Sequence, residues 1–146
     1  MKIAVAKGDG IGPEIMDAVL NIFNAGKVQL EYIFVDMGKW VFDKGFSNGM
    51  TPEAKHTIEE LGMLFKGPME TPKGKGVKSV NVTARKTWNT YANKRVFQTL
   101  HGVDTLFSKA GIPIDITIVR ENIEDTYGGI EHMLTQDVAL SRRFIT

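Results

Sequence analysis

The opening residues constrain the fold most, because an apolar run leads into a tight turn and then into a helix. Residues 2–6 (KIAVA) end at Gly8-Asp9-Gly10, a pattern typical of a buried strand that enters a turn. Gly12-Pro13 then begins a helix, since proline at the first helical position loses no hydrogen bond that the helix needs. We predict a strand–turn–helix unit that ends at Gly26 in a left-handed conformation.

Two further strand-like segments follow, with a helix between them. Residues 28–35 (VQLEYIFV) predict a second strand, and residues 63–65 (MLF) predict a third. The intervening helix is expected to start at a Thr51 cap followed by proline and to end at Gly62. Strands separated by helices imply a parallel sheet, so the fold class is α/β, a partial doubly wound sheet. Ligands of such sheets bind at the carboxyl ends of the strands.

The second half of the chain has a different pattern. We predict a helix over 81–92, a loop over 101–112 and an alternating strand over 114–119, with short β-like pieces from residue 128 onward. The change of architecture suggests two domains. Residues 1–98 would form the first part of the large α/β domain with its substrate loop, and residues 99–146 would begin a small domain.

Composition excludes several classes of protein. The net charge of +1 gives no reason to expect nucleic acid or an anionic membrane surface as a partner. The absence of cysteine excludes disulfides, a thiol nucleophile and a cysteine zinc site, and suits the cytoplasm. The three histidines have no metal-ligand spacing, and no apolar run is long enough to span a bilayer.

Two glycine-containing loops each allow two interpretations. Residues 8–14 (GDGIGPE) resemble a phosphate-binding loop, but a proline replaces a helix amide that an anion would need, so the spacing favours a tight strand-to-helix turn. Residues 67–78 (GPMETPKGKGVK) could receive an anionic ligand through amides and lysines, or could be a solvated surface loop.

Polar and basic side chains after these loops could receive a carboxylate. Ser79, Asn81 and Arg85 follow the second loop, and Arg95 comes ten residues later. Arginine donates to a carboxylate through a forked pair of N–H groups, whereas Ser79 or Asn81 could instead only cap a helix. On one continuous helix the two arginines would diverge by about 80°, so a shared pocket would need a bend.

A charge-dense segment leaves the strand over 114–119. It begins with Arg120, and Tyr127 precedes two glycines. Such a segment is often only a solvated turn, but a tyrosine hydroxyl can serve as a general acid in a suitable site.

In this order, the segments resemble the isocitrate/isopropylmalate dehydrogenase family over essentially the whole chain. The similar segments are GDGIGPE at 8–14, KGP…TP.G.G at 66–76, SVNVTAR at 79–85, YANKR at 91–95 and REN.ED.Y.GIEHM at 120–133.

The resemblance implies a substrate and roles for particular residues. Isocitrate-specific members have the serine–asparagine–arginine pattern, so isocitrate, a tricarboxylate, is the implied substrate. It would be bound by Ser79, Asn81, Arg85, Arg95 and Arg120, with Tyr127 as proton donor and Thr71 near the nicotinamide. The implied reaction is hydride transfer to NAD or NADP followed by loss of the β-carboxylate, assisted by Mg²⁺ or Mn²⁺.

The chain also departs from the family pattern. Glu70 stands where a second threonine is usual, Val96 replaces a proline, and Gly128 replaces an alanine or serine. Family members are more than twice as long, and their remaining part supplies the catalytic lysine, the metal-binding aspartates and the residues that select NAD or NADP. We assign no metal ligand in residues 1–146.

Two hypotheses remain open at this point. The chain is either the truncated amino-terminal part of an isocitrate dehydrogenase, not catalytic alone, or a standalone binding or regulatory protein derived from one. In both cases we expect a homo-oligomer or a protein partner that covers the open edge of the sheet.

Overall fold

The structure, a computed structural model, describes residues 1–71, 79–127 and 129–145. Its contacts divide the chain into two compact units, Met1–Ala84 and Arg85–Thr146. The division falls before the domain boundary predicted between residues 98 and 99, and that boundary stays a prediction.

The first unit is built on a three-stranded parallel sheet in the order β2-β1-β3. The strands are β1 (Lys2–Ala6), β2 (Glu31–Phe34) and β3 (Leu64–Lys66). The chain thus places its second and third strands on opposite sides of β1. Because such crossovers are right-handed, the helices between these strands cover opposite faces of the sheet. This is the predicted doubly wound arrangement.

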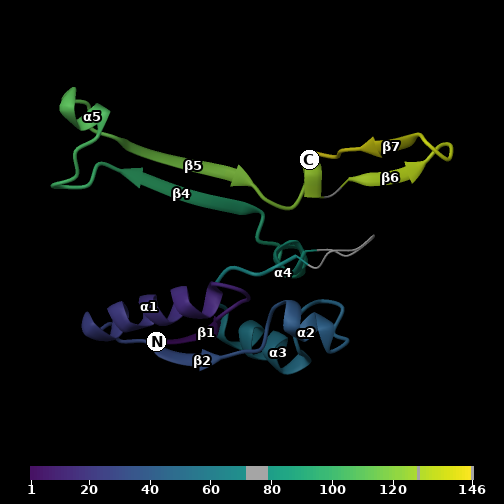
Figure 1. Cartoon of the computed structure of the whole chain (residues 1–146), viewed down its shortest axis with the longest axis horizontal. Coiled ribbons are helices and arrows are strands. Elements are labelled where there is room, and N and C mark those ends of the chain that lie inside the picture. Colours follow the sequence, from purple (N-terminus) through teal and green to yellow (C-terminus); the bar gives the residue numbers. More distant parts are fainter. Residues whose placement is uncertain (72–78, 128, 146) are drawn as a thin grey trace. The chain divides into compact units, whose positions relative to one another are not determined.

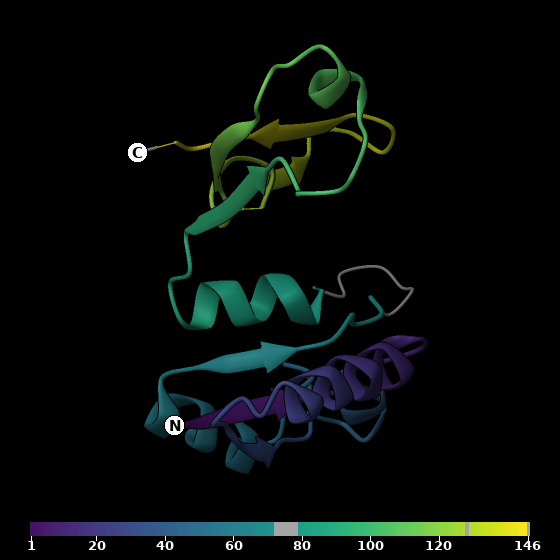
Figure 2. The same ribbon diagram turned by 90° about the vertical axis from the view of Figure 1, so that its left-hand side faces the viewer.

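Helix α1 (Gly12–Ala25) covers one face of the sheet (Figures 1 and 2). Ile3 and Val5 of β1 form a core cluster with Met16 and Leu20 of this helix. Burial of such side chains contributes roughly 1.5–3 kcal/mol each, so this cluster is one source of stability in the unit. The predicted proline start of α1 is confirmed.

Helix α3 (Pro52–Leu61) packs against β1 as well, and its Ala54 and Ile58 are buried. The alternate β1 residues Ala4 and Ala6 are fully buried, as expected for a strand covered on both faces. Both predicted ends of α3 are confirmed. The Thr51 side chain accepts a hydrogen bond from the Ala54 amide, and Gly62 is left-handed with φ 66°.

Several predictions for the first unit were wrong in detail. Gly26 is not left-handed, since its φ is −75°, and Lys27 takes the left-handed conformation instead with φ 52°. Residues 28–30 belong to a turn in which the Leu30 amide donates to the Val28 carbonyl, so β2 is shorter than predicted. The short helix α2 (Lys39–Asp43) was not predicted.

Helix α4 (Val80–Thr87) is shorter than the helix predicted over 81–92. Asn89 adopts a left-handed conformation with φ 49° and ends the helical path. Residues Ala92–Gln98 instead form strand β4, because they pair with the next strand along the chain. Asn81 therefore lies inside α4 and does not cap it. Ser79 directly precedes α4, and its carbonyl accepts a hydrogen bond from the Thr83 amide.

The second unit consists mainly of two antiparallel hairpins (Figure 1). Strand β4 pairs with β5 (Asp115–Glu121), and β6 (Ile130–Met133) pairs with β7 (Ala139–Arg142). The predicted loop over 101–112 contains helix α5 (Leu106–Lys109), which begins with a capping box between Thr105 and Ser108. A short 3₁₀ helix, η1 (Asp125–Tyr127), precedes the second hairpin.

Few side chains of the second unit are buried. The buried apolar residues of the described chain all lie at or before Ala84, and Asn122 is its one buried polar residue, 6% exposed. Its Nδ2 donates to the Thr90 carbonyl at 3.4 Å, which ties the end of β5 to the segment before β4. The second unit therefore depends on strand pairing far more than on an apolar core. Over the described residues, no helix has the length and apolar character needed to cross a membrane.

Candidate carboxylate site and cofactor-side loop

Three of the predicted site residues lie together in the second unit. Arg85 comes from the last turn of α4, Arg120 from the end of β5, and Tyr127 from η1. Arg120 Nη2 donates a hydrogen bond to the Tyr127 hydroxyl. The Arg120 and Arg85 guanidinium carbons lie 5.5 Å and 5.7 Å from the centre of the tyrosine ring, within cation–π range. The two guanidinium groups and the phenol of Tyr127 thus form one cluster.

This cluster is chemically suited to an anionic ligand. Guanidinium groups offer only donors, so the Tyr127 oxygen accepts from Arg120 and its own O–H remains available to donate. Arginine forks bind carboxylates bidentately, and two of them concentrate positive charge beside the hydroxyl. The arrangement can hold a carboxylate and present a proton to it.

Arg95 lies on the same face of the β4–β5 ribbon as Arg120. Asn93 pairs directly with Arg120 across the two strands, and Arg95 is two residues from Asn93, so the three side chains share a face. Arg95 Nε donates to Asn93 Oδ1 at 3.2 Å. The strand, and not a bent helix, is therefore what places Arg95 on the side of Arg120.

Ser79, Asn81 and Thr71 belong to the first unit. Asn81 and Arg85 are four residues apart on α4 and so occupy one face of that helix. Asn81 Oδ1 is buried and has no hydrogen-bond partner among the described residues. A buried acceptor of this kind needs a donor, which a bound ligand could supply. Thr71 is exposed in the segment that follows β3.

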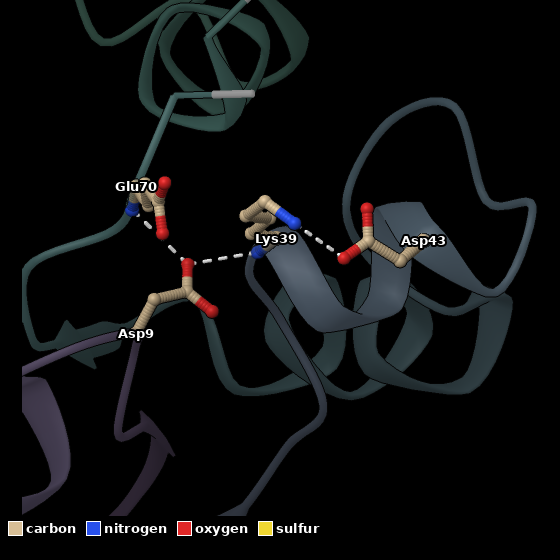
Figure 3. Close-up of polar contacts among 4 residues, drawn as sticks. All are labelled: Asp9, Lys39, Asp43 and Glu70. Atoms are coloured by element: carbon tan, nitrogen blue, oxygen red, sulfur yellow. Dashed lines mark hydrogen bonds and ion pairs between the residues drawn. The ribbon is translucent and has the colours of Figure 1, made fainter. Parts of the chain in front are cut away.

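A second polar cluster lies at the carboxyl ends of β1 and β3, and sequence reasoning missed it. Asp9 Oδ2 accepts hydrogen bonds from the backbone amides of Lys39 (2.8 Å) and Glu70 (3.1 Å), as Figure 3 shows. Asp43 binds the Lys39 ammonium from the next turn of α2. The side-chain hydrogen bond to Asp43 raises the pKa of Lys39, burial opposes it, and Glu70 and Asp9 raise it further. In the sequence, the only sign of this cluster is Asp9, an acidic residue between two glycines.

This cluster decides between the two interpretations of GDGIGPE. Asp9 donates its own amide to the Pro68 carbonyl at 2.9 Å, and the Gly12 amide donates to the Asp9 carbonyl at 2.8 Å. These amides are already used within the protein, and the loop carries a carboxylate at its centre. The segment is a tight turn that joins two loops, and it does not form a phosphate cradle.

The described residues at the carboxyl edge of the sheet offer little that fits the phosphates of a nicotinamide cofactor. Thr71 offers an exposed hydroxyl at the carboxyl edge of the sheet, where ligands of such sheets bind. Lys7 and Lys39 at this edge are already ion-paired with Asp17 and Asp43. Residues 73, 75 and 78, the lysines of the predicted anion loop, lie outside the described residues.

No group of three or more histidine, aspartate or glutamate side chains in the described residues could hold a metal ion. These residues do not fit the divalent ion that the resemblance implies.

The chain thus combines a parallel α/β sheet with a following cluster of two arginines and a tyrosine that is suited to a carboxylate. The family model for isocitrate/isopropylmalate dehydrogenase matches residues 2–145, and the chain belongs to this family.

Curated relatives and solved structures agree with this assignment. The chain is 44% identical over 144 residues to an NADP isocitrate dehydrogenase of Thermus thermophilus, covering 99% of this chain and 29% of that one. It is 37% identical to subunit 2 of the mitochondrial NAD isocitrate dehydrogenase of Saccharomyces cerevisiae, covering 99% of this chain and 37% of that one. An isocitrate dehydrogenase structure from Methylococcus capsulatus matches with a TM-score of 0.82 and 38% identity, covering 99% and 42%. The chain thus spans well under half the length of these relatives.

Proposed function

We propose that the chain is the amino-terminal portion of an isocitrate dehydrogenase-like oxidoreductase and that it binds isocitrate without turning it over alone. The observation that carries the proposal is the meeting of Arg85, Arg120 and Tyr127. It is supported by the relatives, which are named isocitrate dehydrogenases with NADP or with NAD.

In the reaction proposed for the complete enzyme, residues of this chain bind the substrate and move a proton. Arg85, Arg95 and Arg120 hold carboxylates of isocitrate, with Ser79 and Asn81 completing the receptor. Tyr127 donates its hydroxyl proton to the carbon that loses the carboxylate, and Arg120, bonded to the same oxygen, favours the phenolate that remains. The cofactor, NAD or NADP, accepts the hydride when bound, with Thr71 placed beside its nicotinamide. A divalent ion, Mg²⁺ or Mn²⁺, would be held by residues outside this chain.

Calorimetric titration of isocitrate tests the carboxylate site. Wild-type protein should bind isocitrate, and Arg85→Ala should bind it at least about tenfold more weakly, because one charge-assisted hydrogen bond contributes roughly 1.5–3 kcal/mol. Lys86→Ala is the matched control, since Lys86 is an exposed cation one residue further along α4 and should leave the affinity within about twofold. Equal affinities for wild type and Arg85→Ala, or no binding to wild type, would contradict the proposal.

A second candidate function is binding to another protein, as a regulatory chain derived from a dehydrogenase. The observation that favours it is the exposed apolar face of the β4–β5 ribbon, where Phe97, Ile116 and Ile118 are 48–53% exposed on the same side. The sheet edges formed by β2 and β3 also have no strand partner among the described residues. A homo-oligomer or a full-length relative would cover such surfaces. We place the protein in the cytoplasm, in keeping with its lack of cysteine.

Sedimentation velocity distinguishes the two candidates. A regulatory chain should form a stable complex with a full-length isocitrate dehydrogenase. Ile116→Glu should weaken that complex, because it puts a charge on the apolar part of this face, opposite Phe97 and four residues from Arg120. Isocitrate binding by a chain that forms no such complex would leave only the first candidate.

A further inference from the structure

We propose that Asp9 is a positioning residue that fixes the loop carrying Glu70 and Thr71 against the start of α2. Its consequence for cofactor binding rests on the proposed function, because that function places Thr71 beside the nicotinamide. The hydrogen-bonded connection itself can be tested without any ligand.

The Asp9 carboxylate connects segments that are distant in the sequence. One oxygen, Oδ2, accepts from the amide of Lys39, which begins α2, and from the amide of Glu70, 61 residues away in sequence. Lys39 donates through its backbone, while its side chain pairs with Asp43 (Figure 3). The Asp9 bonds therefore hold backbone, so they set the path of both segments and not merely a side-chain rotamer.

The backbone of the Asp9 turn makes a second connection to the same loop. The Asp9 amide donates to the Pro68 carbonyl, two residues before the amide that its carboxylate accepts. The Gly67 amide donates to the Ala6 carbonyl at 2.8 Å. The loop after β3 is thus held at Gly67, Pro68 and Glu70, by Ala6 at the end of β1 and by Asp9 in the turn that follows.

Glycines allow the close approach that these bonds require. A Cβ atom at Gly38 would lie 2.6 Å from Asp9 Oδ1, and one at Gly8 would lie 1.9 Å from the Pro68 carbonyl oxygen. A Cβ atom at Gly67 would lie 2.2 Å from the Lys7 carbonyl oxygen. Any other residue at these positions would push the connected segments apart, so the glycines and Asp9 form one packing unit.

Amide chemical shifts of the whole chain, compared by NMR between wild type and variants at one pH, test the connection. An amide proton that donates to a carboxylate is shifted downfield by that hydrogen bond. Asp9→Asn keeps the shape of the side chain and removes its charge, so the Lys39 and Glu70 amide protons should both move upfield. Asp43→Asn is the matched control, because it removes a charge from the same cluster but leaves both Asp9 bonds in place.

Amide hydrogen exchange measures the strength of the connection. Asp9→Ala removes the acceptor, and exchange at Glu70 should accelerate at least about tenfold, while slow amides in β1 serve as a check that the fold persists. If the Lys39 and Glu70 amide shifts are the same in Asp9→Asn as in wild type, or if Glu70 exchange is unchanged in Asp9→Ala, Asp9 does not position the loop. A wild-type protein that fails to bind isocitrate would instead overturn the proposed function and leave this result standing.

Discussion

At the scale of single residues, the environment of a carboxylate decides what it does, and sequence spacing does not reveal that environment. From the sequence alone, Asp9 is one polar residue of a predicted turn. In the structure, its side chain accepts backbone hydrogen bonds from two segments that are distant in the sequence. Glu121 ends β5, and its side chain accepts from the amides of Ile123 and Glu124 at 2.8 and 2.9 Å. Both carboxylates thus satisfy backbone donors that would otherwise need water.

Glu121 should titrate at a lower pH than an ordinary glutamate. Burial raises its pKa, but the amides of Ile123, Glu124 and Asn122 lower it by more, with help from Arg120, so the net pKa lies below the usual value. A folded pKa below the unfolded one adds stability above the unfolded pKa, and this contribution is lost as the pH falls through the folded pKa. The carbon-13 shift of the Glu121 carboxyl group should therefore show a midpoint below 4.5.

The amides of Ile123 and Glu124 provide an internal check on Glu121. Their proton shifts should follow the same midpoint in wild type and lose it in Glu121→Gln. The control Glu60→Gln, at an exposed position of α3, should leave these shifts unchanged. A Glu121 midpoint at or above the usual glutamate value would contradict the role of the three amides.

At the scale of elements, local signals predicted the first unit well and the second only in part. Thr51, Pro52 and Gly62 mark the ends of α3 through caps that depend on neighbouring residues alone. Strand β4 was not predicted, because its sequence (ANKRVFQ) becomes a strand only by pairing with β5. Such pairing is a long-range contact, and it overrides a weak local preference. The site followed the same rule: the family motif identified Arg95, but only the strand register places it on the face of Arg120.

The Thr51 cap should have a measurable effect on stability. Its Oγ accepts from the Ala54 amide at 3.1 Å, and loss of such a cap costs about 1 kcal/mol, in a range of roughly 0.5–2 kcal/mol. Thr51→Ala should lower the free energy of unfolding by this amount in urea denaturation followed by circular dichroism. Thr51→Ser keeps the acceptor oxygen and should lose little. Equal stability of wild type and Thr51→Ala would show that the cap is not used in solution.

At the scale of the whole molecule, stability is unevenly distributed between the two units. Fully buried apolar side chains such as Val5 and Val41 belong to the first unit, whereas the ribbon residue Ile118 is 49% exposed. Amide exchange should therefore be slowest in β1, at the free energy of global unfolding, and much faster in β4–β5 and β6–β7. Equal protection of β1 and the hairpins would contradict this division.

Two matched substitutions test the same division through stability. Val5→Ala removes buried methyl groups and leaves a cavity in the core, and should destabilise the protein by about 2 kcal/mol or more. Ile118→Ala removes more apolar volume but from an exposed position, and should change the free energy of unfolding by no more than about 0.5 kcal/mol. Chemical denaturation with the same probe gives both values. A larger loss of stability in Ile118→Ala than in Val5→Ala would mean that Ile118 belongs to a buried apolar core in solution.

The close approaches around Asp9 also predict how this chain tolerates mutation. Gly8, Gly38 and Gly67 lie in loops, where substitutions are usually accepted, but a side chain at any of them would meet backbone or carboxylate oxygen. Gly45 has open space around it, with a positive φ of 99° as its only restriction. A saturation scan for folded protein should therefore show strong intolerance at Gly8, Gly38 and Gly67 and a milder effect at Gly45. Glycines that resemble a phosphate-binding motif would then be explained by the close packing of two loops.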